Sequence, residues 1–125
     1  MNSFEELEVW KECRIFKNMV KDIVKTFPDF EKFRLTDQLI RSSRSVNSNI
    51  AEGYGRFNYI DNVRFCRVAR GSLNESLNHL IDALDENYIT EDVLSNLRTQ
   101  YTKCLRLLNG YIAYLIKSKK EEKLS

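Results

Sequence analysis

Helix-breaking residues are scarce in this sequence, which has one proline and four glycines among its 125 residues. Leu, Lys, Arg, Glu and Asn recur throughout, a composition that favours helix over sheet. The sequence contains no internal repeat and no low-complexity tract. A chain of this length can bury around two thirds of its unfolded surface without disulfides or a metal. We therefore expect a single domain with one core.

Long apolar runs are also missing, because no uninterrupted apolar run exceeds a few residues. The amino-terminal residues 1–6 are acidic and lack the apolar centre of a signal peptide. These absences predict a soluble cytoplasmic protein with no membrane partner.

Cysteine is rare and its spacing is uninformative for redox or metal chemistry. The three cysteines, Cys13, Cys66 and Cys104, form an odd set without a Cys-x-x-Cys motif. Each falls on an apolar helical stripe, and free cysteine buries like a small hydrophobic residue. We expect three reduced thiols in the core.

The usual groups for catalysis are absent. The single histidine, His79, has Glu75 and Asp82 at helical spacing, but a di-iron bundle needs a Glu-x-x-His pair on each of two helices. A Ser-His-Asp set is missing, and cysteine nucleophiles would lack a base. The 53–55 segment Gly-Tyr-Gly follows a helix rather than a strand and lacks the third glycine of a nucleotide loop. We expect no enzyme activity, metal or cofactor, and a surface or interface position for His79.

What the sequence does contain is a set of amphipathic segments. Apolar positions that step by three or four predict helices over about residues 3–26, 36–53, 59–86 and 90–116. Their core-facing stripes are Leu7, Trp10, Cys13, Phe16, Val20, Ile23 and Phe27; Leu39, Ser43, Val46 and Ile50; Val63, Cys66, Ala69, Leu73, Leu77, Leu80 and Leu84; and Leu94, Leu97, Tyr101, Cys104, Leu108, Tyr111 and Leu115.

Local signals mark the ends of these helices. Residues 3–6, Ser-x-x-Glu, have the form of a capping box, and Thr36 and Asn58 have side chains that can cap the second and third helices. We expect Gly53 and Gly55 to take the left-handed backbone that closes the second helix.

Short connections between long helices predict an all-α, antiparallel up-down-up-down four-helix bundle. We assign it to residues 1–116 and expect the charged tail 117–125 to fray. Thr90, followed by two acidic residues, begins the fourth helix. Gly71 lies in the middle of the third, where close approach of another helix would compensate its cost of about 1 kcal/mol.

Arginine is the remaining chemical signal. The net charge of +2 is too small to identify a nucleic-acid-binding protein, but all seven basic residues between positions 34 and 70 are Arg. We interpret Arg56, Arg64, Arg67 and Arg70 as candidate phosphate ligands, because a guanidinium can bind two oxygens at once. Alternatively, Arg56 pairs with Glu52, and Arg67 or Arg70 forms salt bridges within an oligomer.

Two motifs resemble those of a known family. They are Asn-Ile-Ala-Glu-Gly at 49–53 and Ala-Arg-Gly-Ser at 69–72, in the usual order and separation. The chain is similar, over about residues 4–116, to the bacterial four-helix-bundle proteins associated with intervening sequences of 23S ribosomal RNA genes. This resemblance implies a ring-like homopentamer. It also implies kinship with the accessory protein of diversity-generating retroelements, which binds nucleic acid and a reverse transcriptase.

Two functions therefore stay open at the level of sequence. The first is a homo-oligomer that binds RNA or DNA through the four arginines. The second is an oligomeric protein-interaction scaffold, with a reverse transcriptase as one conceivable partner. In that case hydrogen bonds within or between subunits are formed by Ser45, Ser48, Asn49, Glu52 and Arg70. Gly53 and Gly71 are then structural or interface positions.

Overall fold

The computed structural model describes residues 3–124, and within them all regular structure is helical. The long helices are α1 (Glu8–Ile23), α2 (Leu35–Gly55), α3 (Tyr59–Asp85) and α4 (Glu91–Leu124). Three short 3₁₀ helices lie before α2, namely η1 (Phe4–Glu6), η2 (Val24–Thr26) and η3 (Asp29–Glu31). The predicted all-α fold with four long helices is confirmed.

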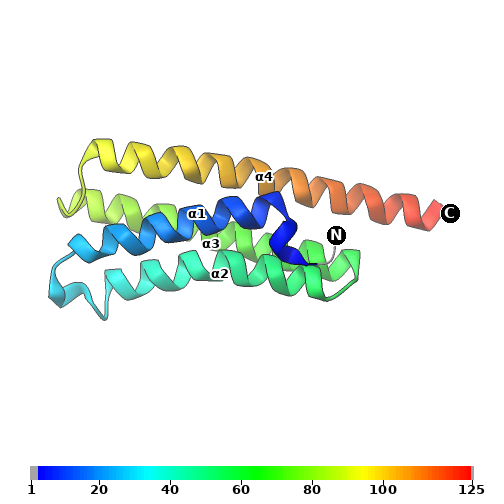
Figure 1. Ribbon diagram of the computed structural model, residues 1–125, viewed down its shortest axis with the longest axis horizontal. Coiled ribbons are helices and arrows are strands. Elements are labelled where there is room, and N and C mark those ends of the chain that lie inside the picture. Colours follow the sequence, from blue (N-terminus) through cyan, green and yellow to red (C-terminus); the bar gives the residue numbers. More distant parts are fainter. Residues whose placement is uncertain (1–2, 125) are drawn as a thin grey trace.

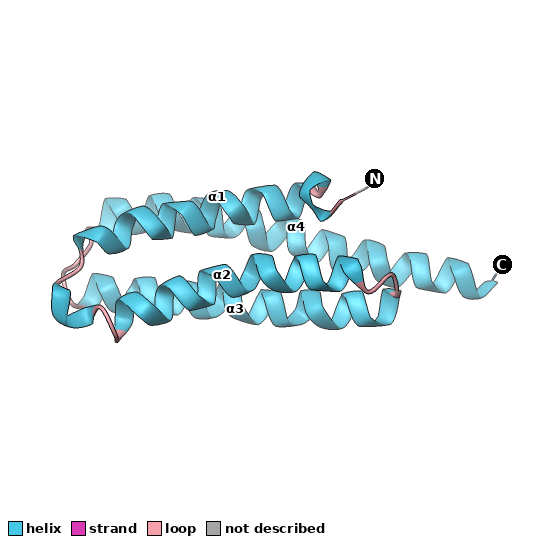
Figure 2. Ribbon diagram, turned by 60° about the horizontal axis from the view of Figure 1, so that its bottom comes forward, coloured by secondary structure: helices cyan, strands magenta, loops and turns pink. Residues whose placement is uncertain are grey.

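Consecutive helices run in opposite directions and lie side by side (Figures 1 and 2). α1 packs between α2 and α4, and α3 closes the bundle by contacting both α2 and α4. The amino terminus, the α2–α3 turn and the end of α4 share one end of the bundle, and α4 projects beyond the other helices there (Figure 1). No helix in residues 3–124 combines the length and apolar character needed to cross a bilayer.

The core contains the predicted stripes and six further buried apolar residues that the stripes left out, namely Val9, Val24, Leu35, Ala83, Ile89 and Ile112. Every residue in those stripes is buried or half-buried, and the largest fully buried side chains come from all four helices. The three cysteines are free and buried, as expected. Burial of these stripes is the main contribution to stability that the chain can make without a disulfide.

Two predicted helix starts are wrong in position. Ser3 caps the short η1, where its hydroxyl accepts from the Glu5 amide, and α1 begins only at Glu8. Thr36 lies inside α2 rather than capping it. The Glu31 carboxylate accepts from the Leu35 amide at 3.4 Å, so a side chain from the connecting segment takes the capping role.

The end of α2 also differs from the prediction. No glycine in residues 3–124 has a positive φ, and the left-handed residue after α2 is Phe57, with φ 53°. Asn58 caps α3 as predicted, because its side chain accepts from the Asp61 amide at 3.0 Å. Thr90 caps α4 in the same way, through the Val93 amide at 3.2 Å.

The described part of the carboxyl-terminal tail, residues 117–124, is helical rather than frayed, and Ser125 lies outside the described residues. α4 continues without a break to Leu124. Neither glycine nor proline follows Gly110, and the Lys- and Glu-rich sequence there has good helix propensity. The extension carries lysine side chains past the start of α3, which matters for the surface described next.

Candidate nucleic-acid interface

Arg56 and Arg64 come together over one aromatic ring at the α2–α3 turn. Their guanidinium carbons lie 5.1 and 5.8 Å from the ring centroid of Phe65 on α3. The predicted pair of Arg56 with Glu52 is present at 2.9 Å, and Arg64 pairs with Asp61 at 3.0 Å. Such exposed pairs between residues of one helix are weak and screened by salt, so both guanidiniums can exchange partners.

Arg67 faces a different surface, the groove between the start of α3 and the end of α4. This groove has a volume of about 370 Å³, with Ile60, Val63 and Ile116 as its apolar part. Lys119 and Lys120 complete its lining, which contains no carboxylate. Three cations therefore surround an apolar strip without an acidic residue among them, which favours an anionic ligand.

Arg70 is separate from both groups. Its guanidinium donates to the Asn109 side chain on α4 at 2.9 Å, a contact that holds it between α3 and α4. The spacing of Arg64, Arg67 and Arg70, three residues apart, would place them on one side of a helix. The structure instead divides the four predicted arginines into the Arg56–Arg64 pair, Arg67 with the lysines, and Arg70.

Lys119 and Lys120 were missed because the tail was expected to fray. A signal was available in the sequence. The apolar stripe of the fourth helix reaches Leu115 and Ile116, and no helix-breaking residue follows it. Continuation by one further turn would have placed Lys119 on the same side as Ile116.

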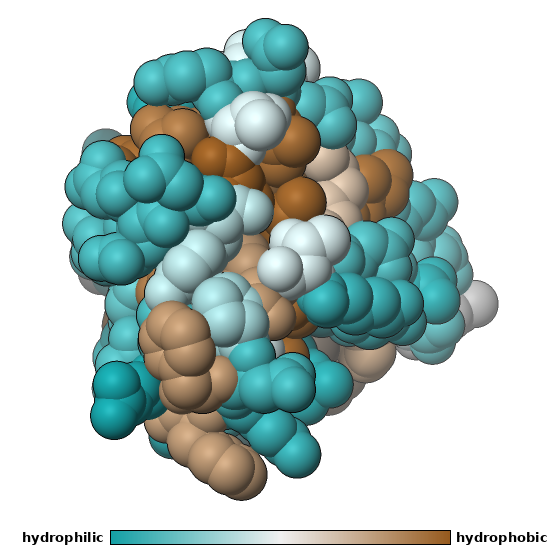
Figure 3. Space-filling model, turned by 90° about the vertical axis from the view of Figure 1, so that its left-hand side faces the viewer, coloured by the Kyte–Doolittle hydropathy of each residue, from teal (hydrophilic) through white to brown (hydrophobic). Residues whose placement is uncertain are grey.

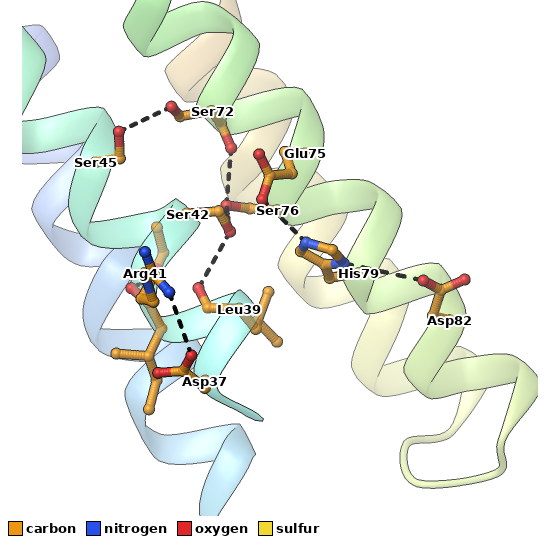
Figure 4. A network of polar contacts seen from close by, with 12 residues as sticks. Asp37, Leu39, Arg41, Ser42, Ser45, Ser72, Glu75, Ser76, His79 and Asp82 are labelled. Atoms are coloured by element: carbon orange, nitrogen blue, oxygen red, sulfur yellow. Dashed lines mark hydrogen bonds and ion pairs between the residues drawn. The ribbon is translucent and has the colours of Figure 1, made fainter. Parts of the chain in front are cut away.

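The polar side of α2 forms a seam with α3 (Figure 4). The hydroxyls of Ser42 and Ser76 are 2.8 Å apart, and those of Ser45 and Ser72 are 2.9 Å apart. Outside this seam lies an open groove of about 620 Å³. Its lining residues include Arg41, Arg44, Ser48 and Glu75.

The candidate interface residues of α2 bond within their own helix. Ser48 donates to the Arg44 carbonyl at 3.1 Å, and Asn49 donates to the Ser45 carbonyl at 2.8 Å. With Glu52 bound to Arg56, all three side chains have partners inside the chain. The donor groups of Ser48 and Asn49 are therefore used within the helix, whereas the hydroxyl, amide and carboxylate oxygens keep acceptor capacity.

The two glycines singled out from the sequence have opposite surroundings. A Cβ on Gly53 would lie 2.7 Å from Oδ1 of Asn62 and 3.0 Å from Cβ of Phe65, so this glycine permits close packing of α2 on α3. A Cβ on Gly71 would meet nothing within 4 Å. The expected close approach of another helix at Gly71 is thus wrong for the isolated chain.

His79 lies on α3 between two carboxylates (Figure 4). Nε2 is 3.1 Å from Glu75, and Nδ1 is 3.9 Å from Asp82. The His79 ring is mostly covered by the protein. In the described part of the chain, no set of three or more His, Cys, Asp or Glu residues is arranged to hold a metal ion.

The thiols are poorly suited to nucleophilic chemistry. Burial raises the pKa of Cys66 to about 11. A hydrogen bond with Cys104, together with burial, raises the pKa of Cys13 well above its usual value. Because the thiolate is the reactive form, these side chains are inert at neutral pH.

The buried carboxylate of Glu12 links α1 to α4. Glu12 contacts the Lys103 ammonium at 3.0 Å and accepts from Gln100 at 3.1 Å. The Lys103 contact, followed by that of Gln100, holds the pKa of Glu12 below its usual value. The contact is structural, because it links α1 to α4 through a buried carboxylate.

The fold and its surface define a four-helix bundle with a cationic groove between α3 and α4. The profile of the 23S rRNA-intervening sequence protein family matches residues 5–110. The chain belongs to this family, as its two motifs suggested.

A solved structure supports the fold. It is a protein of unknown function from the S23 ribosomal protein family of Bacteroides thetaiotaomicron VPI-5482, with a TM-score of 0.76 and 23% sequence identity. The similarity covers 83% of this chain and 97% of that one. No protein with a curated description matches the sequence.

Proposed function

We propose that this protein is a cytoplasmic, non-enzymatic homo-oligomer that binds RNA or DNA through the cationic end of the bundle. The observation that carries the proposal is the groove in which Arg67, Lys119 and Lys120 surround an apolar strip without a carboxylate in the lining. Arg56 and Arg64 add two guanidiniums at the same end. Phosphate contacts of this kind supply sequence-independent affinity for nucleic acid.

Assembly would strengthen this surface. The family resemblance implies a ring of five subunits, and a ring repeats a modest cationic patch several times on one particle. The outer side of α3 offers a contact surface, because Gly71 is exposed there and Val68 is 51% exposed. A mid-helix glycine with no neighbour in its own chain is suited to close packing against a second copy.

Nucleic-acid binding can be tested with fluorescence anisotropy on labelled RNA and DNA at low salt, followed by a salt titration. We expect affinity to fall by about 0.9 log units per log unit of salt for each duplex phosphate neutralised. The triple variant Arg67→Ala, Lys119→Ala and Lys120→Ala should bind more weakly and with a shallower salt slope.

A matched control removes three cations from the opposite end of the bundle: Lys25→Ala, Lys32→Ala and Arg34→Ala. Figure 3 looks onto that end, where apolar side chains project among hydrophilic ones. The control has the same net charge as the triple variant but keeps the three cations of the groove. It should therefore bind nucleic acid better than the triple variant. Equal losses in the two variants would refute the assignment of the site, and no binding by the unmodified oligomer would refute the function.

The oligomer can be tested by light scattering. Gly71→Leu should lower the particle mass without loss of helix content, because nothing in the same chain obstructs a side chain there. Gly110→Leu is the control, since Gly110 is likewise exposed and unobstructed but lies on α4. A monomeric wild type, or equal masses for all three proteins, would contradict this interface.

The second candidate function is a protein-interaction scaffold, for example for a reverse transcriptase. It is favoured by the hydrogen bonds that Ser48 and Asn49 donate within α2 and by the ion pair of Glu52 with Arg56, which leave no unpaired charge at these three positions. Unchanged assembly and partner binding after Arg70→Ala and Glu52→Ala would count against it.

A further inference from the structure

Phe57 has an unfavourable backbone conformation for its residue type. It lies in the α2–α3 turn with φ 53°, in the left-handed region. A bulky residue with this conformation is an outlier, because its Cβ crowds the following carbonyl. Gly55 and Asn58, which tolerate this conformation better, stand two residues before it and immediately after it but do not take it.

The side chain of Phe57 does not compensate this cost within the chain. It is 89% exposed, and its ring contact in the described residues is with Tyr54, at a centroid distance of 6.3 Å. The turn thus carries two costs, a left-handed aromatic residue and an apolar ring in water. Strain without a local benefit is a feature of binding and active sites.

The surroundings of the ring indicate a ligand class. A groove of about 420 Å³ is lined by Phe57, Tyr59, Ile60 and Lys119, with Asn58 and Glu122. Arg56 precedes Phe57 and places its guanidinium over the ring of Phe65 on α3. Exposed aromatic rings beside cations are the elements with which proteins bind single-stranded nucleic acid, through base stacking and phosphate contacts.

We propose that Phe57 is a stacking platform for an unpaired base, so that this surface binds single-stranded RNA or DNA in preference to duplex. The inference rests on the proposed nucleic-acid function and specifies its ligand. Arg56 and Lys119 contact the phosphates on either side of the stacked base. In a duplex the base faces are already stacked on one another, and Phe57 contributes nothing to binding.

The deciding variant is Phe57→Asn, which removes the ring and suits the left-handed backbone. Binding is measured by anisotropy with a 12-nucleotide oligouridine and with an RNA duplex, using the full chain. We expect the affinity for the single strand to fall roughly 5- to 150-fold, with little change for the duplex. The midpoint of chemical unfolding should rise, because the backbone strain is relieved.

Three comparisons make the result specific. Phe57→Trp should retain single-strand affinity. Phe33→Asn, which removes a ring that is 84% exposed beside Lys32 at the other end of the bundle, should leave it unchanged. The slope of log affinity against log salt should be the same in Phe57→Asn as in wild type, whereas Lys119→Ala should make it shallower.

Each other outcome overturns the inference. If wild type binds single strands and Phe57→Asn binds them equally well, the ring is not a stacking platform. If single-strand and duplex affinities fall together, or if the particle mass falls in Phe57→Asn, the ring instead supports the whole surface or a subunit contact. If wild type binds neither nucleic acid, the proposed function itself fails.

Discussion

The two turns that flank α3 each contain a residue with a left-handed backbone. In the α3–α4 turn this residue is Asn87, with φ 63°, and in the α2–α3 turn it is Phe57, with φ 53°. Asparagine tolerates this conformation because its short side chain can bond locally, whereas a bulky aromatic residue gains nothing from it. The same backbone requirement is therefore met at low cost in one turn and at high cost in the other.

The residues that follow the left-handed position are bonded or buried in the α3–α4 turn and exposed in the α2–α3 turn. After Asn87, the Tyr88 amide donates to the Ala83 carbonyl at 2.9 Å, the Tyr88 hydroxyl donates to Glu31 at 2.8 Å, and Ile89 is buried. After Phe57, Asn58 and Tyr59 are exposed, and Ile60 is 57% exposed. Local rules, together with the hydrogen bond from Tyr88 to Glu31, explain the first of these turns. The second turn departs from them where the cationic surface lies, which is where such departures are expected in functional proteins.

The largest effect should come from Gly53, which sets the distance between α2 and α3 just before the Phe57 turn. In Gly53→Ala the new Cβ would lie within about 3 Å of Asn62 and Phe65. Overpacking of this kind costs about 1–3 kcal/mol. Urea denaturation should show this loss in the free energy of unfolding.

Gly55→Ala is the control for Gly53→Ala, because a Cβ at Gly55 would meet nothing within 4 Å. We expect it to be neutral or stabilising by up to about 1 kcal/mol. Equal stabilities of the two variants would show that α2 and α3 do not approach closely at Gly53.

Exchanging the residue types at the two left-handed positions tests the difference in strain between the turns. Asn87→Phe should destabilise the protein by about 1 kcal/mol, and Phe57→Asn should stabilise it by a similar amount, because the left-handed backbone costs a bulky residue about 1–2 kcal/mol. Chemical denaturation of each variant against wild type measures both. A change of the same sign in both variants would contradict the idea that only the α2–α3 turn is strained.

The smallest effect should be a pH dependence that belongs to the α3–α4 turn. Burial, with the Glu31 carboxylate as its hydrogen-bond partner, raises the pKa of Tyr88 to about 12. Since the unfolded phenol ionises near pH 10, the stability from this group is complete below pH 10 and is lost as the pH rises toward 12. Denaturation curves at pH 8 and pH 11 should show a smaller alkaline loss in Tyr88→Phe than in wild type.

Part of the alkaline loss belongs to Cys66, whose pKa of about 11 lies above the ordinary value of 9.0, and this part remains in Tyr88→Phe. An identical pH dependence in Tyr88→Phe and wild type would show that the hydroxyl of Tyr88 does not bind Glu31 in solution.

Much of the fold could be predicted because helix formation and its amphipathic side are local properties. The residues of the stripe from Val63 to Leu84 recur at intervals of three or four, and every one of them is buried or half-buried. Asn58 and Thr90 could be placed as caps because a cap depends on the amides of the next three residues. The Thr36 cap failed because the helix begins one residue earlier, at Leu35, and the Gln38 amide already donates to the Arg34 carbonyl.

The candidate site was predictable only in part. Arg56 and Arg67 could be identified as exposed cations, but their grouping depends on how far α4 extends beside α3. The left-handed backbone of Phe57 could not be predicted from the sequence, because the paired glycines before it suggested that one of them would take this conformation. Sequence patterns record residue types, and neither the register between helices nor the choice of a strained residue follows from them.

By itself the sequence determined four helices, most of the apolar residues they bury and the family to which the chain belongs. Each of these depends on spacing along the chain, where the period of 3.6 residues is enough to define an apolar side. Only the tertiary structure decided that Gly53 permits close packing, that Arg67 meets Lys119 and Lys120, and that Phe57 projects into water. These features arise from the relative positions of neighbouring helices, which are set by the packing of the whole core.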